Sequence, residues 1–303
     1  MKKIKQRFVV VVGPTASGKS DLGIKIARKF NGEIISADSR QVYRGMDIGT
    51  GKVTRQDQKL VKHWLLDVAD PKRQFTASHY KRLAQKAIAN ILHRGKIPII
   101  VGGTGLYIDI LVYNLPLPEV KPNPLLRAQF DKLTVKNLFD KLRKLDPRRT
   151  KTIDRHNKRR LIRALEIVLS TKSPVPILDT RFYSLDSPHD TLWLGITLFK
   201  EKLAQRIKKR LDSRLKAGMI AETKRLHAQG LSWKRLESFG LEYKWIALYL
   251  QKKMTRKEMY TRLLHAIIQY SKRQMTWFKR NKNIHWIKDL REAQKKTAQF
   301  LGS

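Results

Sequence analysis

Blocks of apolar residues alternate with amphipathic stretches along the first hundred residues, and the two patterns predict strands and helices in turn. A phenylalanine and four valines at residues 8–12 predict a buried strand, and the stretch 19–30 predicts a helix. Further strands are predicted at 33–36 and 97–101, with a helix over 77–93 between them. Strands that alternate with helices are typical of a parallel sheet with helices on both faces.

The middle of the chain breaks this alternation. Prolines within residues 116–124 interrupt regular structure, and residues 125–170 then have a helical, strongly basic pattern. A strand pattern returns at 191–198. Three helices and a last short strand are predicted after it, at 201–217, 221–229, 255–282 and 283–287. The chain therefore inserts a helical segment into a core that resumes beyond it.

The segment after the first predicted strand has the pattern G-x-x-x-x-G-K-[ST]. Between a strand and a helix this pattern is typical of a phosphate-binding loop, because its glycines let successive N–H groups converge on phosphate oxygens. An ordinary glycine turn is the alternative. Lys19 would add a mobile positive charge, and the Ser20 hydroxyl could reach a metal ion. The residues expected at a di- or triphosphate are Gly13, Thr15, Ala16, Ser17, Gly18, Lys19 and Ser20.

These patterns together predict an α/β fold, with a P-loop NTPase-like parallel sheet core, helices on both faces, and an all-helical insertion domain. We expect the core to comprise residues 1–115 and 191–303, and the insertion to comprise residues 116–190. Ligands of such sheets bind at the carboxyl ends of the strands. The phosphate loop should therefore converge with the segments 37–41 and 102–105, which follow two other strands.

The composition is strongly basic, with 65 Lys and Arg against 25 Asp and Glu in 303 residues and a formal net charge of +40. Such a charge favours a polyanionic partner, because it speeds encounter and holds a phosphate backbone. An anionic membrane surface, or charge that serves only solubility, is the alternative. No apolar run approaches the roughly 18 residues of a membrane span, and there is no cysteine for disulfides or thiolate metal sites. We expect a cytoplasmic protein without membrane association.

Single residues at the predicted strand ends carry candidate chemistry. Asp38 could act as a general base, bind a metal ion, or be a structural cap on the next helix. Thr104 lies in a glycine-flanked loop and could contact a phosphate or a substrate, or belong to a plain turn. Arg206 and Arg210 lie four residues apart on one predicted helix face, where they could grip a diphosphate or simply face solvent.

Near the C-terminus, residues 272–280 interleave aromatic and basic side chains. This pattern suits stacking on unpaired bases together with phosphate contacts. The alternative is an amphipathic helix that packs Trp277 and Phe278 into the core.

The chain resembles the tRNA dimethylallyltransferases of bacterial type, also called tRNA isopentenyltransferases. The resemblance covers nearly the whole length and rests on the phosphate loop and six further segments. These segments are residues 33–52, 63–68, 102–107, 153–157, 159–166 and 272–278. One segment departs from the family pattern. Residues 239–244 read Phe-Gly-Leu-Glu-Tyr-Lys, where many members carry Ile-Gly-Tyr-Lys-Glu.

The resemblance implies transfer of a dimethylallyl group from dimethylallyl diphosphate to N6 of adenosine 37 in the anticodon stem-loop of a tRNA, by a monomer that uses Mg²⁺. It implies that Asp38 accepts the amine proton, that Arg210 and the phosphate loop neutralise the leaving diphosphate, and that Ser20 holds the metal. Thr104 would touch both substrates. The implied tRNA contacts are Asp38, Ser39, Arg40, Gln41, Thr104, Arg127, Arg159, Arg160, Leu161, Ile162, Arg163, Lys272, Arg273 and Gln274.

Three other hypotheses share parts of this pattern. An adenylate isopentenyltransferase would use a free nucleotide as acceptor and would not need the basic insertion. A phosphate-loop kinase acting on a small molecule would leave the insertion unexplained. A non-catalytic RNA-binding protein would have no use for Asp38 and Thr104 beside a diphosphate site.

Overall fold

The computed structural model describes residues 6–176 and 188–302. By its contacts the chain divides into two compact units. The first combines Met1–Asn114 with Ser187–Ser303, and the second is Leu115–Asp186. Among the described residues, no helix combines the length and the apolar content that crossing a membrane requires.

The first unit is built on a sheet whose six strands are all parallel, in the order β3-β2-β4-β1-β5-β6. Its strands are β1 (Arg7–Val12), β2 (Gly32–Ala37), β3 (His63–Trp64), β4 (Ile97–Gly102), β5 (Asp190–Ile196) and β6 (Ile284–Ile287). The apolar strand β1 lies inside the sheet, where Val9 is paired with Ile99 on one side and with Leu192 on the other. The predicted parallel sheet is confirmed.

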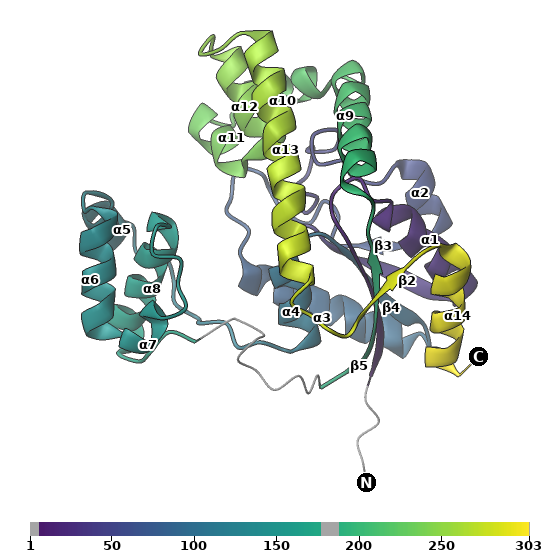
Figure 1. Ribbon diagram of the computed structural model, residues 1–303. Helices are drawn as coiled ribbons and strands as arrows, with labels where there is room; N and C mark the ends of the chain where they lie inside the picture. Colours follow the sequence, from purple (N-terminus) through teal and green to yellow (C-terminus); the bar gives the residue numbers. More distant parts are fainter. Residues whose placement is uncertain (1–5, 177–187, 303) are drawn as a thin grey trace. The chain divides into compact units, whose positions relative to one another are not determined.

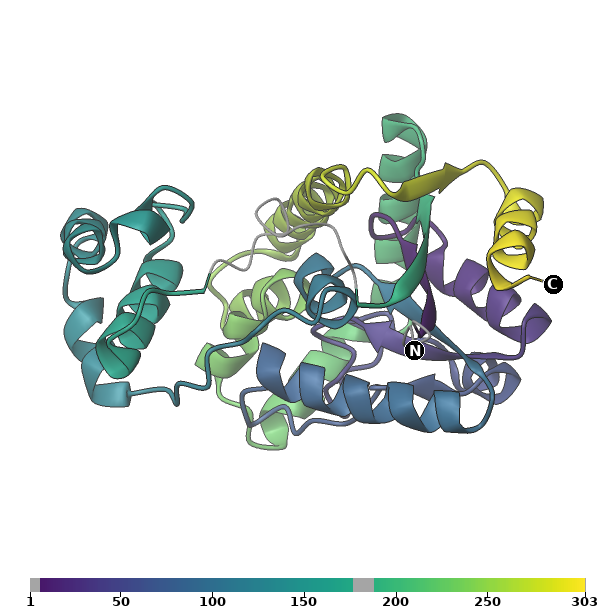
Figure 2. The ribbon, with the colours of Figure 1, turned by 90° about the horizontal axis from the view of Figure 1, so that it is seen from below.

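Alternate residues of β1 face opposite sides of the sheet and enter different cores. Val9 and Val11 pack with α1 (Lys19–Lys29) and α14 (Leu290–Leu301). Phe8, Val10 and Val12 pack with α3 (Ala77–His93) and α4 (Gly105–Val112). The short helix α2 (Arg55–Leu60) begins with a capping box between Thr54 and Asp57. Helices therefore cover both faces of the sheet (Figure 1 and Figure 2).

Five further helices gather beyond the carboxyl end of β5 (Figure 1). They are α9 (Lys200–Lys216), α10 (Met219–Ala228), α11 (Trp233–Phe239), α12 (Leu241–Leu250) and α13 (Arg256–Phe278). Two buried clusters hold them together, one around Leu226, Leu236 and Phe239 and the other around Leu211 and Leu263. The predicted helices of this region are present, although α13 ends at Phe278 rather than at residue 282.

The second unit is helical in its described part. It contains α5 (Pro124–Asp131), α6 (Val135–Leu145), α7 (Pro147–Thr150) and α8 (Lys158–Thr171). Pro124 and Pro147 stand at first helical positions, where a missing N–H costs nothing. Helices α6 and α8 enclose a core that includes Leu138, Leu142 and Leu165.

Candidate active site

Three loops leave the carboxyl ends of neighbouring strands and meet. The phosphate loop follows β1, Asp38 follows β2, and Thr104 follows β4. The Ser39 amide donates to the Thr104 hydroxyl oxygen at 3.1 Å, and the Thr104 amide donates to the Ala37 carbonyl at 3.1 Å. The structure thus brings the loops of Asp38 and Thr104 together, as their places after the carboxyl ends of two strands predict.

The phosphate loop has the backbone that its glycines allow. Gly13 has a φ of 149°, and a Cβ there would lie 2.5 Å from the Ile196 carbonyl oxygen. Gly18 has a φ of 100° and immediately precedes α1. The Ser17 hydroxyl is buried and has no hydrogen-bond partner among the described residues. A loop with this geometry presents N–H groups and a helix N-terminus to an anion.

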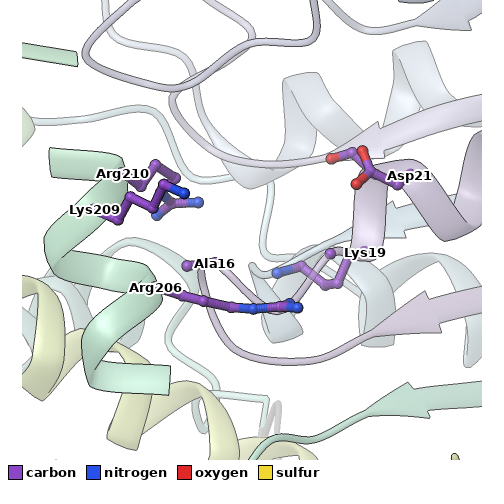
Figure 3. A pocket seen from close by; sticks show the side chains of 8 residues that line it. Ala16, Lys19, Asp21, Arg206, Lys209 and Arg210 are labelled. Carbon is purple, nitrogen blue, oxygen red and sulfur yellow. The ribbon is translucent and has the colours of Figure 1, made fainter. Parts of the chain in front are cut away.

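A cavity of about 360 Å³ opens at this loop. Figure 3 shows Arg206, Lys209 and Arg210 projecting from α9 toward the loop that carries Ala16 and Lys19. The lining is completed by Gly18, Ser20 and Asp21. Four cations and one carboxylate leave a strong excess of positive charge, which suits a diphosphate.

Burial and the neighbouring positive charges lower the pKa of two of these cations. Removal from water, together with the charge of Arg210 and against the pull of Asp38, lowers the pKa of Lys19 to about 7. The Lys19 ammonium donates to the Pro14 carbonyl at 2.7 Å. Burial lowers the pKa of Arg210 to about 10, with Arg214 adding to the effect and Glu242 opposing it. A dianionic ligand would raise both pKa values again, because its charge would stabilise the protonated forms of Lys19 and Arg210.

Asp38 is held by its own loop. Its Oδ1 accepts from the amides of Arg40 at 2.8 Å and Gln41 at 3.2 Å. Asp38 therefore caps a turn and not a helix, because residues 39–42 form a turn and the next helix begins only at Arg55. This cap uses one oxygen, while Oδ2 has no hydrogen bond within the described residues. One carboxylate can thus both stabilise the turn and accept a proton.

Tyr270 is a site residue that the sequence analysis missed. Its hydroxyl shares a hydrogen bond with Thr104. Burial raises the pKa of this hydroxyl, the charge of Asp38 adds to the rise, and the charge of Arg40 opposes it. Tyr270 precedes Gln274 by one helical turn on α13, so the two side chains share a face. That spacing indicates a shared helix face, but it does not show that this face is buried against the site.

A divalent metal fits the donor set at this site. The described residues contain no group of three or more His, Cys, Asp or Glu that could hold a metal ion. Mg²⁺ does not need one at a phosphate site, since one or two protein oxygens supplement the phosphates and water. The Ser20 hydroxyl lines the cavity and can supply such an oxygen.

Comparison with known proteins shows the family to which the chain belongs. The model of a family described as IPP transferase matches residues 41–281. The chain belongs to the IPP transferase family. The tRNA dimethylallyltransferase of Acetivibrio thermocellus is 39% identical over 283 residues, which is 92% of this chain and 90% of that protein. The tRNA dimethylallyltransferase 1 of Geotalea daltonii is 41% identical over 284 residues, with 92% and 90% covered.

Solved structures of IPP transferases agree with this assignment. The tRNA delta(2)-isopentenylpyrophosphate transferase of Staphylococcus epidermidis is 35% identical with a TM-score of 0.72, covering 98% of this chain and 99% of that one. A eukaryotic dimethylallyltransferase that acts on tRNA is 28% identical with a TM-score of 0.76, covering 90% and 70%. These likenesses confirm the predicted fold class and the family resemblance.

In this IPP transferase the candidate RNA-contacting residues of the second unit fall into two groups. Arg127 and Arg163 both donate to the buried carboxylate of Glu166, Arg127 through two bonds of 2.9 and 2.8 Å and Arg163 at 2.5 Å. Burial would raise the pKa of Glu166, but these bonds and the Asn123 amide lower it to about 2. The two arginines therefore stabilise the unit, whatever else they contact.

The neighbouring residues of α8 divide by burial. Leu161 and Ile162 lie in the core of the second unit, with 0% and 6% of their surface exposed. Because they are buried, these two residues can affect RNA binding only by holding α8 in place. Arg159 and Arg160 are exposed. They are the cations of this segment that a phosphate can reach without disturbing an ion pair.

The C-terminal motif shows the same division. Lys272 and Arg273 are exposed, whereas Gln274 is buried. Trp277 donates to the Asp109 carboxylate at 3.0 Å and Phe278 is 2% exposed. Phe278 therefore packs into the core and Trp277 lies partly buried against it, as the alternative predicted.

The segment that departs from the family pattern forms the junction of α11 and α12. Gly240 joins the two helices with a φ of 75°. Glu242 follows it, is buried, and lies 3.4 Å from the Arg214 guanidinium. Burial raises the pKa of Glu242, and Arg214 opposes that rise. A carboxylate three residues after Phe239 thus lies near enough to the cationic cavity to act on Arg210.

Proposed function

We propose that this protein transfers a dimethylallyl group from dimethylallyl diphosphate to N6 of adenosine 37, beside the anticodon of a tRNA, and releases diphosphate. One observation supports this assignment above the rest. In a member of the IPP transferase family, a cavity with four cations opens at the loop that meets Asp38 and Thr104.

The donor binds by its diphosphate. Lys19, Arg206 and Arg210 line the cavity together with Ala16 and Gly18 of the phosphate loop. Positive groups fixed in advance stabilise the charge that grows on the leaving group as its bond to carbon breaks. Bound at Ser20 and the diphosphate, Mg²⁺ would supply further positive charge to the same oxygens.

The acceptor is an exocyclic amine, which is a weak nucleophile. As the N6–C1 bond forms, the C1–O bond breaks and its electron pair leaves with the diphosphate. The proton lost from N6 passes to Oδ2 of Asp38, which the cap leaves available. Thr104, held by Ser39 and Tyr270, lies where its hydroxyl can orient the incoming nucleotide. The adenine has to leave its stack to reach this site.

Incubation with labelled dimethylallyl diphosphate, Mg²⁺ and unmodified tRNA tests the assignment. We expect label in tRNA and none in AMP. Label in AMP would favour an adenylate isopentenyltransferase. No label in either acceptor, together with phosphoryl transfer from a nucleoside triphosphate, would favour a kinase.

Two variants test the base. Asp38→Ala should abolish turnover while tRNA affinity stays within a few-fold. Asp38→Asn keeps an oxygen for the Arg40 and Gln41 amides but has little basicity, so it should lose turnover without loosening the loop. Near-normal turnover in Asp38→Asn would remove Asp38 as the base.

The surroundings of the reaction follow from the same proposal. We expect exposed cations such as Arg159, Arg160 and Lys272 to bind the anticodon stem-loop mainly through its phosphates and its shape. We propose that the protein works as a monomer in the cytoplasm.

A further inference from the structure

One face of α13 rests against the turn between β4 and α4. Tyr270, Gln274 and Trp277 lie on this face at spacings of four and three residues. Tyr270 bonds to Thr104, Gln274 to Gly103, and Trp277 to Asp109. The helix therefore contacts both the turn and α4, which follows it.

Gln274 makes the central contacts of this face. Its Oε1 accepts from the Thr15 amide at 2.8 Å, and its Nε2 donates to the Gly103 carbonyl at 3.0 Å. The side chain is 6% exposed. A Cβ on Gly103 would lie 2.1 Å from Nε2, so the glycine is what lets the amide approach.

Thr15 is held from a second direction. Its hydroxyl contacts the Arg210 guanidinium of α9, while its amide is bound by Gln274 of α13. Two helices thus converge on one residue at the top of the phosphate loop. The next residue, Ala16, has a φ of 64° and lines the diphosphate cavity. Movement of Thr15 would therefore change the shape of the cavity.

We propose that Gln274 is a positioning residue for the diphosphate donor, acting by fixing the phosphate loop against the loop that carries Thr104. The inference rests on the proposed function for the identity of the donor. The buried amide bridges donor and acceptor loops, whereas the exposed neighbours Lys272 and Arg273 are free to meet RNA. The assignment separates Gln274 from those two residues, with which the motif groups it.

Only an amide of this length satisfies both groups. Glutamate could accept from the Thr15 amide but not donate to Gly103, and its charge would oppose a diphosphate. Methionine has a similar shape and would leave both groups without a partner. Glutamate has nearly the volume of glutamine and methionine is only slightly larger, so both variants should fold.

Affinity for inorganic diphosphate and for tRNA, measured separately, tests the proposal. Gln274→Met should weaken diphosphate binding about tenfold, as the loss of two neutral hydrogen bonds suggests. Gln274→Glu should weaken it further. Both should leave tRNA affinity within about twofold and raise KM for the donor. The matched variant Arg273→Gln should do the reverse, weakening tRNA binding and sparing diphosphate binding.

Inorganic diphosphate keeps this test independent of prenyl transfer. If the wild-type protein transfers no prenyl group, the proposed function fails, yet the comparison of diphosphate affinities still stands. Melting temperatures confirm that each variant is folded, and Gln274→Glu serves where Gln274→Met does not fold. Unchanged diphosphate affinity in a folded variant overturns the proposal, as does a loss confined to tRNA.

Discussion

Lys19 has an ammonium group that is only partly protonated near neutral pH, because removal from water and the charge of Arg210 lower its pKa to about 7. A bound diphosphate would raise that pKa again. Lys19 would then bind its ligand and a proton together. The affinity of the site is thereby linked to pH.

Diphosphate affinity should fall as pH rises above 7. The free site has a pKa of about 7 and the bound site a higher one, so binding takes up a proton in that interval and association weakens with rising pH. One proton limits the slope to about tenfold per pH unit. Calorimetry in two buffers of different ionisation enthalpy measures the uptake.

Lys19→Arg is the matched control, because a guanidinium keeps its charge over the whole range. Titration of the diphosphate itself is common to both proteins and cancels in the comparison. Equal proton uptake by the two proteins would show that Lys19 does not titrate on binding.

Glu33, near the start of β2, has a pKa that favours its charged form, in contrast to Lys19. Burial would raise its pKa, but hydrogen bonds from Arg94, Trp64 and Lys96 outweigh burial and lower the pKa to about 2. A carboxylate with a depressed pKa stabilises the folded state above its unfolded value of 4.5. That stabilisation is lost as pH falls from 4.5 to about 2.

Glu33→Gln should lower the free energy of unfolding by about 3 kcal/mol at pH 7, since it leaves Arg94 and Lys96 without their buried partner. The difference from wild type should shrink between pH 4.5 and pH 2. Urea unfolding across this range measures it. The exposed Glu201→Gln should stay within about 0.5 kcal/mol, and an equally small effect at Glu33 would contradict the prediction.

The residues of the site differ in how well the sequence predicts them. The phosphate loop was predictable because its chemistry depends on eight consecutive positions. Asp38 and Thr104 could be predicted because each follows a strand whose carboxyl end lies at the same edge of a parallel sheet. Tyr270 and the inward orientation of Gln274 could not be derived, because the face that a helix buries depends on partners far away in the chain. Here that partner is Thr15, more than 250 residues earlier.

At the scale of elements, the contact of α13 with the turn before α4 depends on missing side chains. Gly103 admits Gln274, and a Cβ on Gly105 would lie 2.2 Å from Trp277 Cδ1. The Trp277 ring cannot easily retreat, because its Nε1 is bonded to Asp109. Small residues on one element thus set the position of the other.

Gly105→Ala should therefore destabilise the protein by about 1–3 kcal/mol through overpacking. Gly105 has no positive φ, so the cost should come from the collision and not from backbone strain. Denaturant unfolding gives the value. In a Trp277→Val background the cost should largely disappear, and an undiminished cost would exclude Trp277 as its source.

Elements with a strong local pattern were predicted and the others were not. Helix α3 agrees with its predicted range because apolar residues recur at helical spacing between two clear ends. The strand β3 was missed because two residues are too few to carry a pattern. The helices α11 and α12 were missed, since their apolar residues pack against each other around Phe239 and Tyr243. Such tertiary packing leaves no periodic signal.

For the molecule as a whole, positive charge is abundant but unequally available. Arg163 is tied to Glu166, whereas Arg159 and Arg160 are exposed on the same helix. Exposed cations release counterions when they meet phosphates, and that release makes affinity depend on salt. The salt dependence of tRNA binding therefore reports which cations are used.

Arg159→Ala and Arg160→Ala should each weaken tRNA binding and reduce the slope of log affinity against log salt by about 0.7–0.9 per lost phosphate contact. Neither should alter stability. Arg163→Ala should reduce the slope and also destabilise the second unit, because Glu166 would lose one partner in the interior. Filter binding at several salt concentrations and thermal unfolding separate the two effects. An unchanged slope would place the residue outside the interface.

The position of β1 inside the sheet has a consequence for synthesis on the ribosome. Its neighbour β4 is made before the insertion, but its other neighbour β5 is made only after it. From Gly102 to Ile196 the ribosome needs roughly 5–20 s at ordinary rates of elongation. Throughout that interval one apolar edge of β1 has no strand to pair with. The nascent chain must therefore be protected from neighbouring chains, and slower translation of the insertion should lower the yield of folded protein.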